Sequence, residues 1–341
     1  MRKPLVLFSI AMLICACRPT LSPQTKAAGS TDFTIAFGSC NKHDAPNVFW
    51  DDILAAEPDV FIWGGDNVYA DTDDMALLRE TYALQKRVPG YAALIESIPV
   101  TGTWDDHDYG LNDGGTEFVA KQGSQREFLD FMGVGANDPR RQRDGVYATM
   151  MLRKEGASVK IINLDTRFFR TPLTTDERPN RRYRPNTYGS GTILGEAQWQ
   201  WLADELNGSE ADFNLIVSSV QFLSNEHGFE KWANHPHEVD RLVELIKNSK
   251  AKGVIVLSGD RHISEFSSKD IGLTYPLIDF TSSGLTHSYR GFTSEPNPYR
   301  VGSVVSVPSF GLIELKTSER TAQFKIMGDG GEVIQQIKQV Y

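Results

Sequence analysis

The segment Val60–Tyr69, with the sequence VFIWGGDNVY, joins a short apolar run to a polar turn. Val60–Trp63 has the length of a strand, and its β-branched and aromatic residues favour a strand over a helix fragment. The run is continuously apolar, which is typical of a strand buried on both faces of an α/β sheet. Asp66 follows at the carboxyl end, where open α/β sheets bind their ligands. The segment therefore predicts an α/β fold with a functional site at its strand ends.

The same pattern recurs along the chain. Further apolar runs of strand length lie at residues 33–37, 100–104, 159–164, 215–220, 254–257 and 277–280. Apolar residues at helical spacing predict helices over residues 48–57, 74–88, 195–207 and 237–250. From 303 to 341, apolar and polar residues alternate as in an antiparallel meander. The body of the chain is therefore expected to be an α/β domain with a β-rich end.

Polar residues that can bind metal follow most of these runs. The endings are Gly38-Ser39-Cys40, Gly64-Gly65-Asp66, Asp105-Asp106-His107-Asp108, Asp165-Thr166-Arg167 and Gly259-Asp260-Arg261-His262. Carboxylates on neighbouring strand ends cannot all stay ionised without compensation. Basic residues are scarce in the two acidic stretches, residues 66–74 and 105–113. Metal cations supply that compensation, so the sequence predicts a metal site. A solvated acidic loop is the alternative for either stretch alone.

Composition excludes several classes of protein. Of the 341 residues, 40% are hydrophobic and 10% aromatic, which is enough for a sizeable core and excludes disorder as the main state. The formal net charge is −9, whereas a nonspecific nucleic-acid binder needs a basic face. No apolar run reaches the roughly 18 residues of a spanning helix.

The N-terminal region resembles a targeting segment. A basic start precedes the apolar stretch Leu5–Ala16, which is too short to span a bilayer. Leu13-Ile14-Cys15-Ala16-Cys17 resembles a bacterial lipobox. We expect residues 1–16 to be a lipoprotein signal peptide, Cys17 to be lipidated and residues 17–31 to be a tether. The protein would then be an extracytoplasmic, membrane-anchored lipoprotein on the periplasmic face or the cell surface; an ordinary secretory signal is the alternative.

Cysteine usage points to Cys40. The chain has three cysteines, and Cys15 and Cys17 fall in the predicted signal region. In an oxidising compartment, the remaining thiol has no disulfide partner. Cys40 is therefore either a small buried hydrophobic residue or a residue used as a nucleophile or metal ligand.

Three motifs occur in the order found in binuclear metallophosphoesterases. They are Gly-Asp-x-x-Tyr at 65–69, Asp-Asp-His-Asp at 105–108 and Ser-Gly-Asp-x-His at 258–262. Together with Gly38-Ser39-Cys40, they resemble the PhoD-like alkaline phosphatase family, and further matches lie at 164–170, 232–234 and 281–287. The resemblance runs from about Phe33 to His287. It implies a four-layer α-β-β-α sandwich, with residues 32–341 as a single catalytic domain and the metals at its rim.

The resemblance also implies Fe³⁺ beside Ca²⁺, with Mn²⁺ or Zn²⁺ as alternatives at the second site. The implied ferric ligands are Cys40, Asp66, Tyr69 and His262. Asp66 would bridge to the second metal, whose further ligands would be Asp105, Asp106, Asp260 and Asn112. Independently, thiolate and phenolate donors suit Fe³⁺, whereas Ca²⁺ prefers oxygen ligands alone. Gln221 stands where relatives outside this branch often have a metal-binding histidine. The nearby His227 could substitute for that histidine or be a surface residue, and we favour the surface residue.

Three residues are candidates for work on the substrate. His107 could protonate a departing alkoxide or donate to phosphate, because an imidazole titrates near neutral pH. Arg167 could hold phosphate oxygens with its two-pronged guanidinium, or could pair with Asp165 or Asp176. His287 could face the site and bind substrate, or could cap a loop.

The expected function is hydrolysis of phosphate monoesters or diesters by a metal-activated hydroxide. One alternative is a phospholipase- or nuclease-type phosphodiesterase of the same fold. Another is a catalytically silent surface lipoprotein that is stabilised by its metals. The expected partners are a phosphate-ester substrate and a membrane bound through the lipid anchor, with no specific nucleic acid or protein partner.

Overall fold

The continuously apolar runs form the centres of two sheets in the computed structural model, which describes residues 31–292 and 294–341. The predicted signal peptide, Cys17 and almost all of the predicted tether lie outside the described residues. Thr31–Tyr341 form one compact unit, in agreement with the predicted single domain. Within the described residues, no helix has the length and apolar character needed to cross a bilayer.

The first sheet has the strand order β15-β14-β13-β1-β2-β3. Its strands are β1 (Phe33–Gly38), β2 (Val60–Gly64), β3 (Val100–Thr103), β13 (Phe310–Lys316), β14 (Thr321–Met327) and β15 (Val333–Val340). β1, β2 and β3 are parallel, whereas β13 pairs antiparallel with β1 and continues into β14 and β15. The alternation near the C-terminus therefore forms the predicted meander, added to the edge of a parallel sheet.

The second sheet has the order β12-β10-β11-β9-β8-β5-β4. Its strands are β4 (Ala148–Lys154), β5 (Ala157–Asn163), β8 (Phe213–Val217), β9 (Val254–Ser258), β10 (Ser264–Lys269), β11 (Leu277–Ser282) and β12 (Arg300–Val305). β5, β8, β9 and β11 are parallel. The short strands β6 (Thr174–Thr175) and β7 (Tyr183–Arg184) pair in a separate hairpin.

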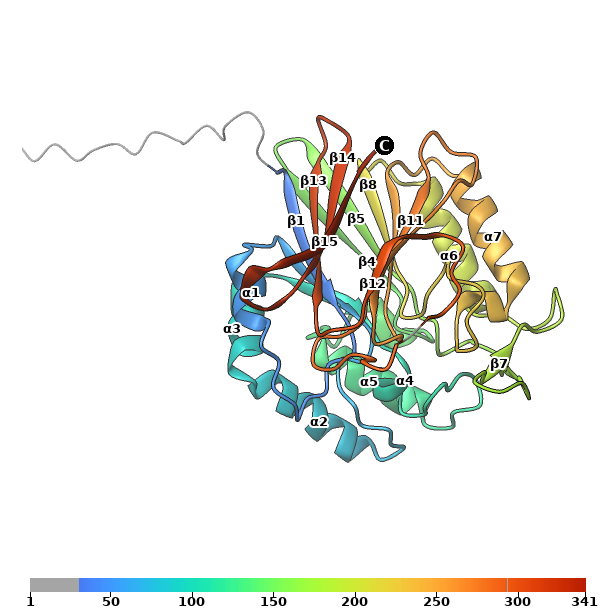
Figure 1. Cartoon of the computed structure of the whole chain (residues 1–341). Helices are drawn as coiled ribbons and strands as arrows, with labels where there is room; N and C mark the ends of the chain where they lie inside the picture. The colour runs from blue at the N-terminus through green and yellow to red at the C-terminus, as the bar shows by residue number, and fades with distance from the viewer. Residues whose placement is uncertain (1–30, 293) are drawn as a thin grey trace, which may run out of the picture. The chain divides into compact units, whose positions relative to one another are not determined.

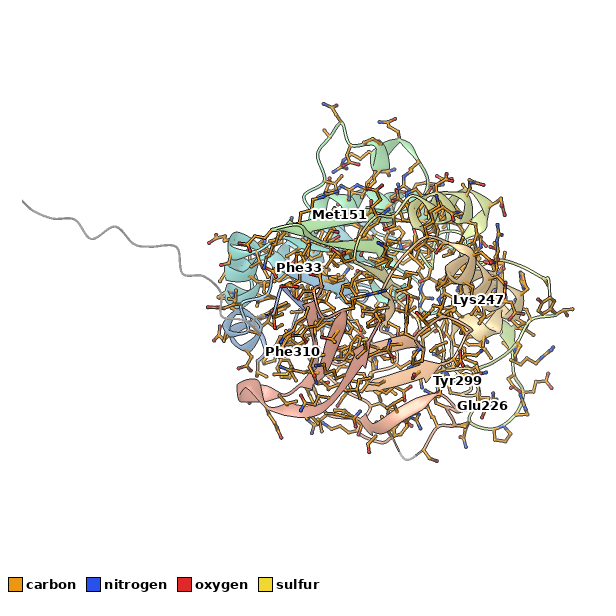
Figure 2. The ribbon with its side chains drawn as sticks, turned by 90° about the horizontal axis from the view of Figure 1, so that it is seen from above. Phe33, Met151, Glu226, Lys247, Tyr299 and Phe310 are labelled. Atoms are coloured by element: carbon orange, nitrogen blue, oxygen red, sulfur yellow. The ribbon has the colours of Figure 1, made fainter. Side chains whose placement is uncertain are left out.

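Helices cover the outer face of each sheet. On the first sheet's side are α1 (Trp50–Ala55), α2 (Met75–Arg87), α3 (Pro89–Ser97), α4 (Asp106–Tyr109) and α5 (Lys121–Phe131); α6 (Gly195–Asn207) and α7 (Pro236–Asn248) cover the second. Single 3₁₀ turns lie at Pro139–Gln142, Trp232–Asn234 and Asp329–Gly331. Figure 1 shows α1, α2 and α3 on one side of the strands and α6 and α7 on the other. From above, Phe33 and Phe310 of the first sheet lie far from Lys247 of α7 (Figure 2).

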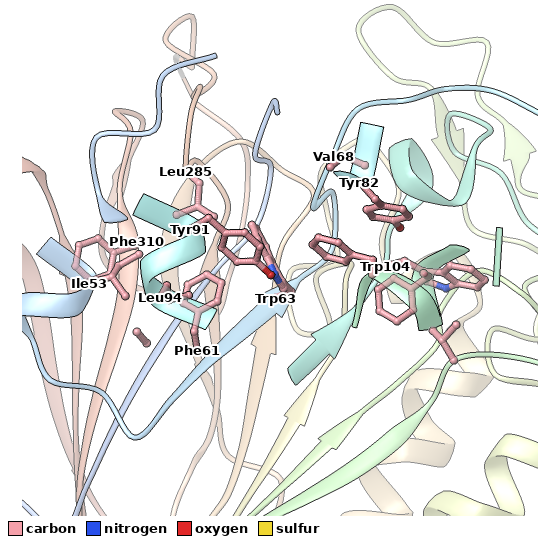
Figure 3. Close-up of a cluster of buried hydrophobic side chains, with 14 of the residues drawn as sticks. Ile53, Phe61, Trp63, Val68, Tyr82, Tyr91, Leu94, Trp104, Leu285 and Phe310 are labelled. Atoms are coloured by element: carbon pink, nitrogen blue, oxygen red, sulfur yellow. The ribbon is translucent and has the colours of Figure 1, made fainter. Parts of the chain in front are cut away.

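Alternate residues of one strand enter different cores, which confirms the four-layer α-β-β-α sandwich. In β2, Phe61 and Trp63 join the cluster beneath α1–α5, together with Tyr91 and Leu94 (Figure 3). Ile62, between them in sequence, enters the cluster between the two sheets. Because successive side chains point to opposite faces of a strand, a strand with helices on one face and a sheet on the other must be apolar at every position. The continuously apolar runs in the sequence therefore reflect strands that are buried on both faces.

Candidate metal centre

Several of the predicted metal ligands follow strands of the two sheets and have a positive backbone φ angle, which is unusual for residues other than glycine. Cys40 follows β1 with a φ of 60°, and Asp66 follows β2 with a φ of 51°. After β9, Asp260 and His262 have φ values of 66° and 53°. Residues with a side chain rarely adopt this left-handed region, and such strain is found most often where a functional site over-determines the backbone. These sharp turns bring the four side chains to one rim of the sandwich.

Cys40, Asp66, Tyr69 and His262, the implied ferric ligands, meet at that rim. The Cys40 thiol donates a hydrogen bond to Asp66 Oδ2 at 3.3 Å, and the Tyr69 hydroxyl donates to the same oxygen at 3.1 Å. Tyr69 Oη also lies 3.0 Å from His262 Nε2. Ligand atoms of Cys40, Asp66 and His262 all lie within 4.8 Å of one another, so a single cation can contact them together.

A second, carboxylate-rich cluster adjoins the first. Ligand atoms of Asp105, Asp106 and Asp260 lie within 4.8 Å of one another, and Asp66 forms another such group with Asp106 and His107. Asp66 therefore belongs to both neighbourhoods, as a bridging ligand must. Asn112 is exposed and lines the adjoining cavity beside Asp106; its role as a ligand stays a prediction.

The electrostatics of the cluster favour bound cations. Burial, followed by the nearby Cys40 and Asp106, raises the pKa of Asp66 well above its ordinary value. Burial likewise raises the pKa of Cys40 to about 12. Buried oxygens Asp105 Oδ2 and Asp106 Oδ1 have no hydrogen-bond partner among the described residues. Positive ions at these positions would supply the missing partners and stabilise the anionic forms. The residues present therefore fit the metal centre that the sequence predicts.

His107 lies at the edge of the cluster on α4. Its ring stacks on Tyr69 with a centroid separation of 4.1 Å, and its Nδ1 lies 2.7 Å from Asp71 Oδ1. Burial opposes protonation, but the Asp71 hydrogen bond and the charge of Asp106 outweigh it and raise the pKa of His107. The raised pKa favours the protonated imidazole, and Nε2 is the ring nitrogen that does not contact Asp71.

His287 faces the centre. Its ring packs against His262 and Tyr69, with centroid separations of 4.4 and 5.2 Å. Nδ1 lies 3.0 Å from Thr286 Oγ1, whereas Nε2 is buried and has no hydrogen-bond partner among the described residues. We expected His287 either to face the site or to cap a loop, and in the structure it faces the site.

Arg167 has different contacts from those predicted. Its side chain is fully buried, with Nε 2.5 Å from Asp105 Oδ1 and Nη1 2.6 Å from Glu230 Oε2. Its guanidinium pairs with neither Asp165 nor Asp176, the partners that we considered, and it is not part of the cavity wall. Arg167 therefore fixes the position of Asp105 through this contact, and its burial does not support direct contact with phosphate.

Two further expectations concern the segment after β8. Gln221 Nε2 donates to Glu265 Oε1 and Thr281 Oγ1, each at 2.9 Å, and so takes no part in the cluster. The interpretation of His227 as a surface residue is wrong, because its side chain is 2% exposed. The chain folds back so that the Phe229 N–H donates to His227 Nδ1 at 3.2 Å. Burial and nearby cations lower the pKa of His227 well below its ordinary value.

A cavity of about 350 Å³ opens beside the cluster. Its wall contains the predicted residues Asp106, His107, Asn112, Asp260 and His262 together with Asp113, Arg182, Phe229, Glu230, Arg261 and Tyr289. Sequence reasoning missed this second set. Arg261, inside the Ser-Gly-Asp-x-His motif, and Asp113, beside Asn112 in an acidic run, carried a local signal, whereas the other four residues lie outside the motifs.

Adjoining clusters of candidate metal ligands that share Asp66, at the rim of an α-β-β-α sandwich, are typical of the metallophosphoesterase class of protein. Within that class, residues 35–291 match the model of the PhoD-like phosphatases. The chain therefore belongs to the PhoD-like phosphatase family, a family of phosphoric ester hydrolases.

Individual relatives agree with this assignment. The chain is 27% identical over 150 residues to alkaline phosphatase D of Bacillus subtilis (strain 168), a match that spans 39% of this chain and 26% of that protein. A solved structure of PhoD aligns with a TM-score of 0.70 and 18% identity, over 92% of this chain and 69% of that chain.

Two other structures share the fold. GAP50, the anchor in the inner membrane complex of Plasmodium, aligns with a TM-score of 0.59 and 14% identity, over 91% of this chain and 89% of that chain. A dimetal phosphatase from Danio rerio aligns with a TM-score of 0.52 and 11% identity, over 92% of this chain and 100% of that chain. At these identities the likeness concerns the fold, on which different activities can reside.

Proposed function

We propose that the protein is a metal-dependent phosphoesterase that hydrolyses phosphate monoesters or diesters. One observation carries the proposal: Asp66 joins two clusters of ligand atoms, and both clusters adjoin a cavity that also contains His107. The cavity has room for a phosphate group with a small organic part. The family assignment and the dimetal phosphatase fold support the same chemistry.

The donor sets support different metals at the two sites. Cys40, Tyr69 and His262 offer a thiolate, a phenolate and an imidazole, which suit Fe³⁺. Asp105, Asp106 and Asp260 offer carboxylate oxygens, and Asn112 an amide oxygen, which suit Ca²⁺, with Mn²⁺ or Zn²⁺ as alternatives. When bound, such a pair of cations lowers the pKa of a water molecule and offsets charge on the phosphoryl oxygens.

The chain's own side chains supply proton transfer and orientation. The His107 imidazole, held by Asp71 at 2.7 Å, would protonate the departing alkoxide. The Thr286 hydroxyl donates to the Cys40 carbonyl and therefore accepts from Nδ1 of the neutral His287 ring. The buried Nε2 has no protein partner among the described residues and could accept a hydrogen bond from a hydroxyl group of the substrate. Arg167 keeps Asp105 in position through the 2.5 Å contact between Nε and Oδ1.

Asp71→Asn should shift the pH dependence of turnover. Asp71 raises the pKa of His107, so its loss should lower that pKa. Turnover needs protonated His107 and falls as pH rises through this pKa; in the variant, the fall should begin at lower pH. The measurement is kcat against pH with an alkyl phosphate, whose poor leaving group needs the acid. Asp73→Asn, an exposed residue of the same stretch, is the control, and an unshifted profile would remove His107 from this role.

The function itself is tested with defined esters. The purified chain, supplied with Fe³⁺ and Ca²⁺, should hydrolyse phenyl phosphate, diphenyl phosphate or both, and lose the activity to a chelator. Hydrolysis of the diester alone would favour the alternative of a phospholipase- or nuclease-type enzyme. Metal binding without hydrolysis of either ester would favour the silent, metal-stabilised lipoprotein.

We also propose that Cys17 carries a lipid anchor and that the protein is extracytoplasmic. The lipobox-like sequence Leu13-Ile14-Cys15-Ala16-Cys17 supports this. Cys17→Ala should move the protein from the membrane fraction to the soluble fraction of a bacterial host, because acyl chains supply the binding energy. Fractionation followed by immunoblotting measures this, and a Cys40→Ala variant, which keeps the lipobox, should stay in the membrane fraction. An unchanged distribution of Cys17→Ala would refute the anchor.

A further inference from the structure

The wall of the active-site cavity contains basic residues that the hydrolytic chemistry does not use. Arg182 and Arg261 line the cavity together with Phe229, and Lys231 lies buried two residues beyond Phe229. Arg182 comes from the segment before β7, and Arg261 from the turn after β9. These residues belong to a chain whose formal net charge is −9, so basic groups on one part of the wall need an explanation.

Arg261 has an unused donor beside the cavity. Its side chain is 9% exposed, and its Nη2 donates to both carboxylate oxygens of Glu295 at 2.8 Å. The guanidinium carbon lies 4.2 Å from the centroid of the Phe229 ring. Its Nε is buried and has no hydrogen-bond partner in the described chain. A buried N–H left without an acceptor is costly, so this donor is suited to an acceptor that a ligand brings.

Arg182 also has donors available. Its Nη1 lies 2.9 Å from Asp113 Oδ2, and its side chain remains 53% exposed. Asp113 is itself held by the Tyr183 hydroxyl, which donates to the same oxygen at 2.8 Å. The carboxylate therefore fixes one side of the guanidinium, while the remaining N–H groups are free to contact a ligand in the cavity.

Lys231 adds a positive charge behind Phe229. Its side chain is 2% exposed, and its ammonium donates to the Phe229 carbonyl at 3.1 Å. It forms no ion pair with any residue that the structure describes, although buried lysines are almost always paired. Burial first, and then Arg181 and Arg261, lower the pKa of Lys231 to about 8. A negative group bound near Phe229 would stabilise this charge.

We propose that Arg182 and Arg261, with Lys231 behind them, form a second anion subsite that binds a negatively charged group on the organic part of the substrate. The preferred substrates are then phosphate esters that carry a second anionic group. This inference rests on the proposed phosphoesterase function. The cavity of about 350 Å³ is large enough for an aryl or short alkyl group between the two charges.

Two esters of nearly equal size test the subsite. One is 4-carboxyphenyl phosphate, and the other is its uncharged analogue 4-carbamoylphenyl phosphate. With the metal-loaded protein, we expect kcat/KM to be about tenfold higher for the carboxylate ester, because it gains charge-assisted hydrogen bonds. Arg182→Gln should bring the ratio of the two kcat/KM values close to unity, mainly through KM.

Arg184→Gln is the matched control, since Arg184 is exposed, lies two residues from Arg182 and is not part of the cavity wall. It should leave the ratio as in the unmodified protein. Equal kcat/KM values for the two esters in the unmodified protein, or a ratio that Arg182→Gln leaves unchanged, would overturn the second anion subsite. Hydrolysis of neither ester by a preparation that hydrolyses diphenyl phosphate would also overturn the subsite. Hydrolysis of none of the three esters would instead overturn the proposed function, and this inference with it.

Discussion

Asp66→Asn should remove both metals from the protein and lower kcat/KM at least about a thousandfold. Asp66 lies in ligand groups with Cys40 and His262 on one side and with Asp106 on the other. An amide cannot bridge two cations as a carboxylate does, so neither site should keep its metal. Asparagine tolerates the left-handed backbone at this position, where φ is 51°, so the turn after β2 should survive.

Elemental analysis and phosphate-ester assays on the same preparation measure both effects. Asp73→Asn is the matched control, because it removes one exposed carboxylate from the same acidic stretch. The control should keep its metals and its activity. An Asp66→Asn protein that is folded by circular dichroism and still contains its full metal complement would show that Asp66 is not a bridging ligand.

Arg167→Met should lower the free energy of unfolding by about 3–5 kcal/mol. The Arg167 side chain is fully buried, and it neutralises Asp105 and Glu230, which are 0% and 2% exposed. Methionine has a similar length but no charge, so both carboxylates would lose a buried partner. Arg170 Nε, 3.0 Å from Glu230 Oε1, would compensate only part of the loss.

Urea unfolding in a metal-containing buffer measures this change, with both proteins at the same metal concentration. Arg178→Met is the control, since the Arg178 side chain is 64% exposed in its pair with Asp176, and its stability should not change measurably. A loss below about 1 kcal/mol in Arg167→Met would indicate that Asp105 and Glu230 are neutralised by other means.

The fold was predictable because its main signal is local. A strand with a helix layer on one face and a second sheet on the other must be apolar at every position, and β2 and β8 are buried throughout. Helix α5 was missed, since Lys121–Phe131 has polar residues such as Gln125 and Glu127 among its buried positions. Gln125 donates a hydrogen bond to the Arg143 carbonyl in a loop, and Glu127 accepts one from Arg79 of α2. The spacing of apolar residues does not reveal these partners.

The place of the candidate ligands was predictable for a similar reason, because Cys40, Asp66, Asp105 and Asp260 each lie two residues after the end of a strand. The acidic stretches, however, contain residues with different tasks. Asp74 accepts from the Ala76 N–H at 2.8 Å and caps α2, and Asp108 accepts from the Asp105 N–H at 2.7 Å in the cap of α4. The presence of several aspartates in a stretch therefore does not show which of them cap helices and which are candidate metal ligands.

The environment of the centre was not predictable from short motifs. Basic residues are scarce near Asp105 in sequence, yet Arg167 pairs with it from 62 residues away. His227 is buried because the chain folds back around it, although Asn225 and Glu226 just before it are polar and exposed. Such contacts depend on how loops of different strands meet at the rim of the sheets, which only the folded chain determines.

The most direct test of the metal-dependent account is elemental analysis of the protein purified without chelator. The account predicts near-stoichiometric iron together with calcium, bound by the clusters that share Asp66. Zinc or manganese in place of iron would contradict the ferric assignment at Cys40 and Tyr69. No bound metal, even after reconstitution with Fe³⁺ and Ca²⁺, would contradict the metal centre itself and the phosphoesterase chemistry that depends on it.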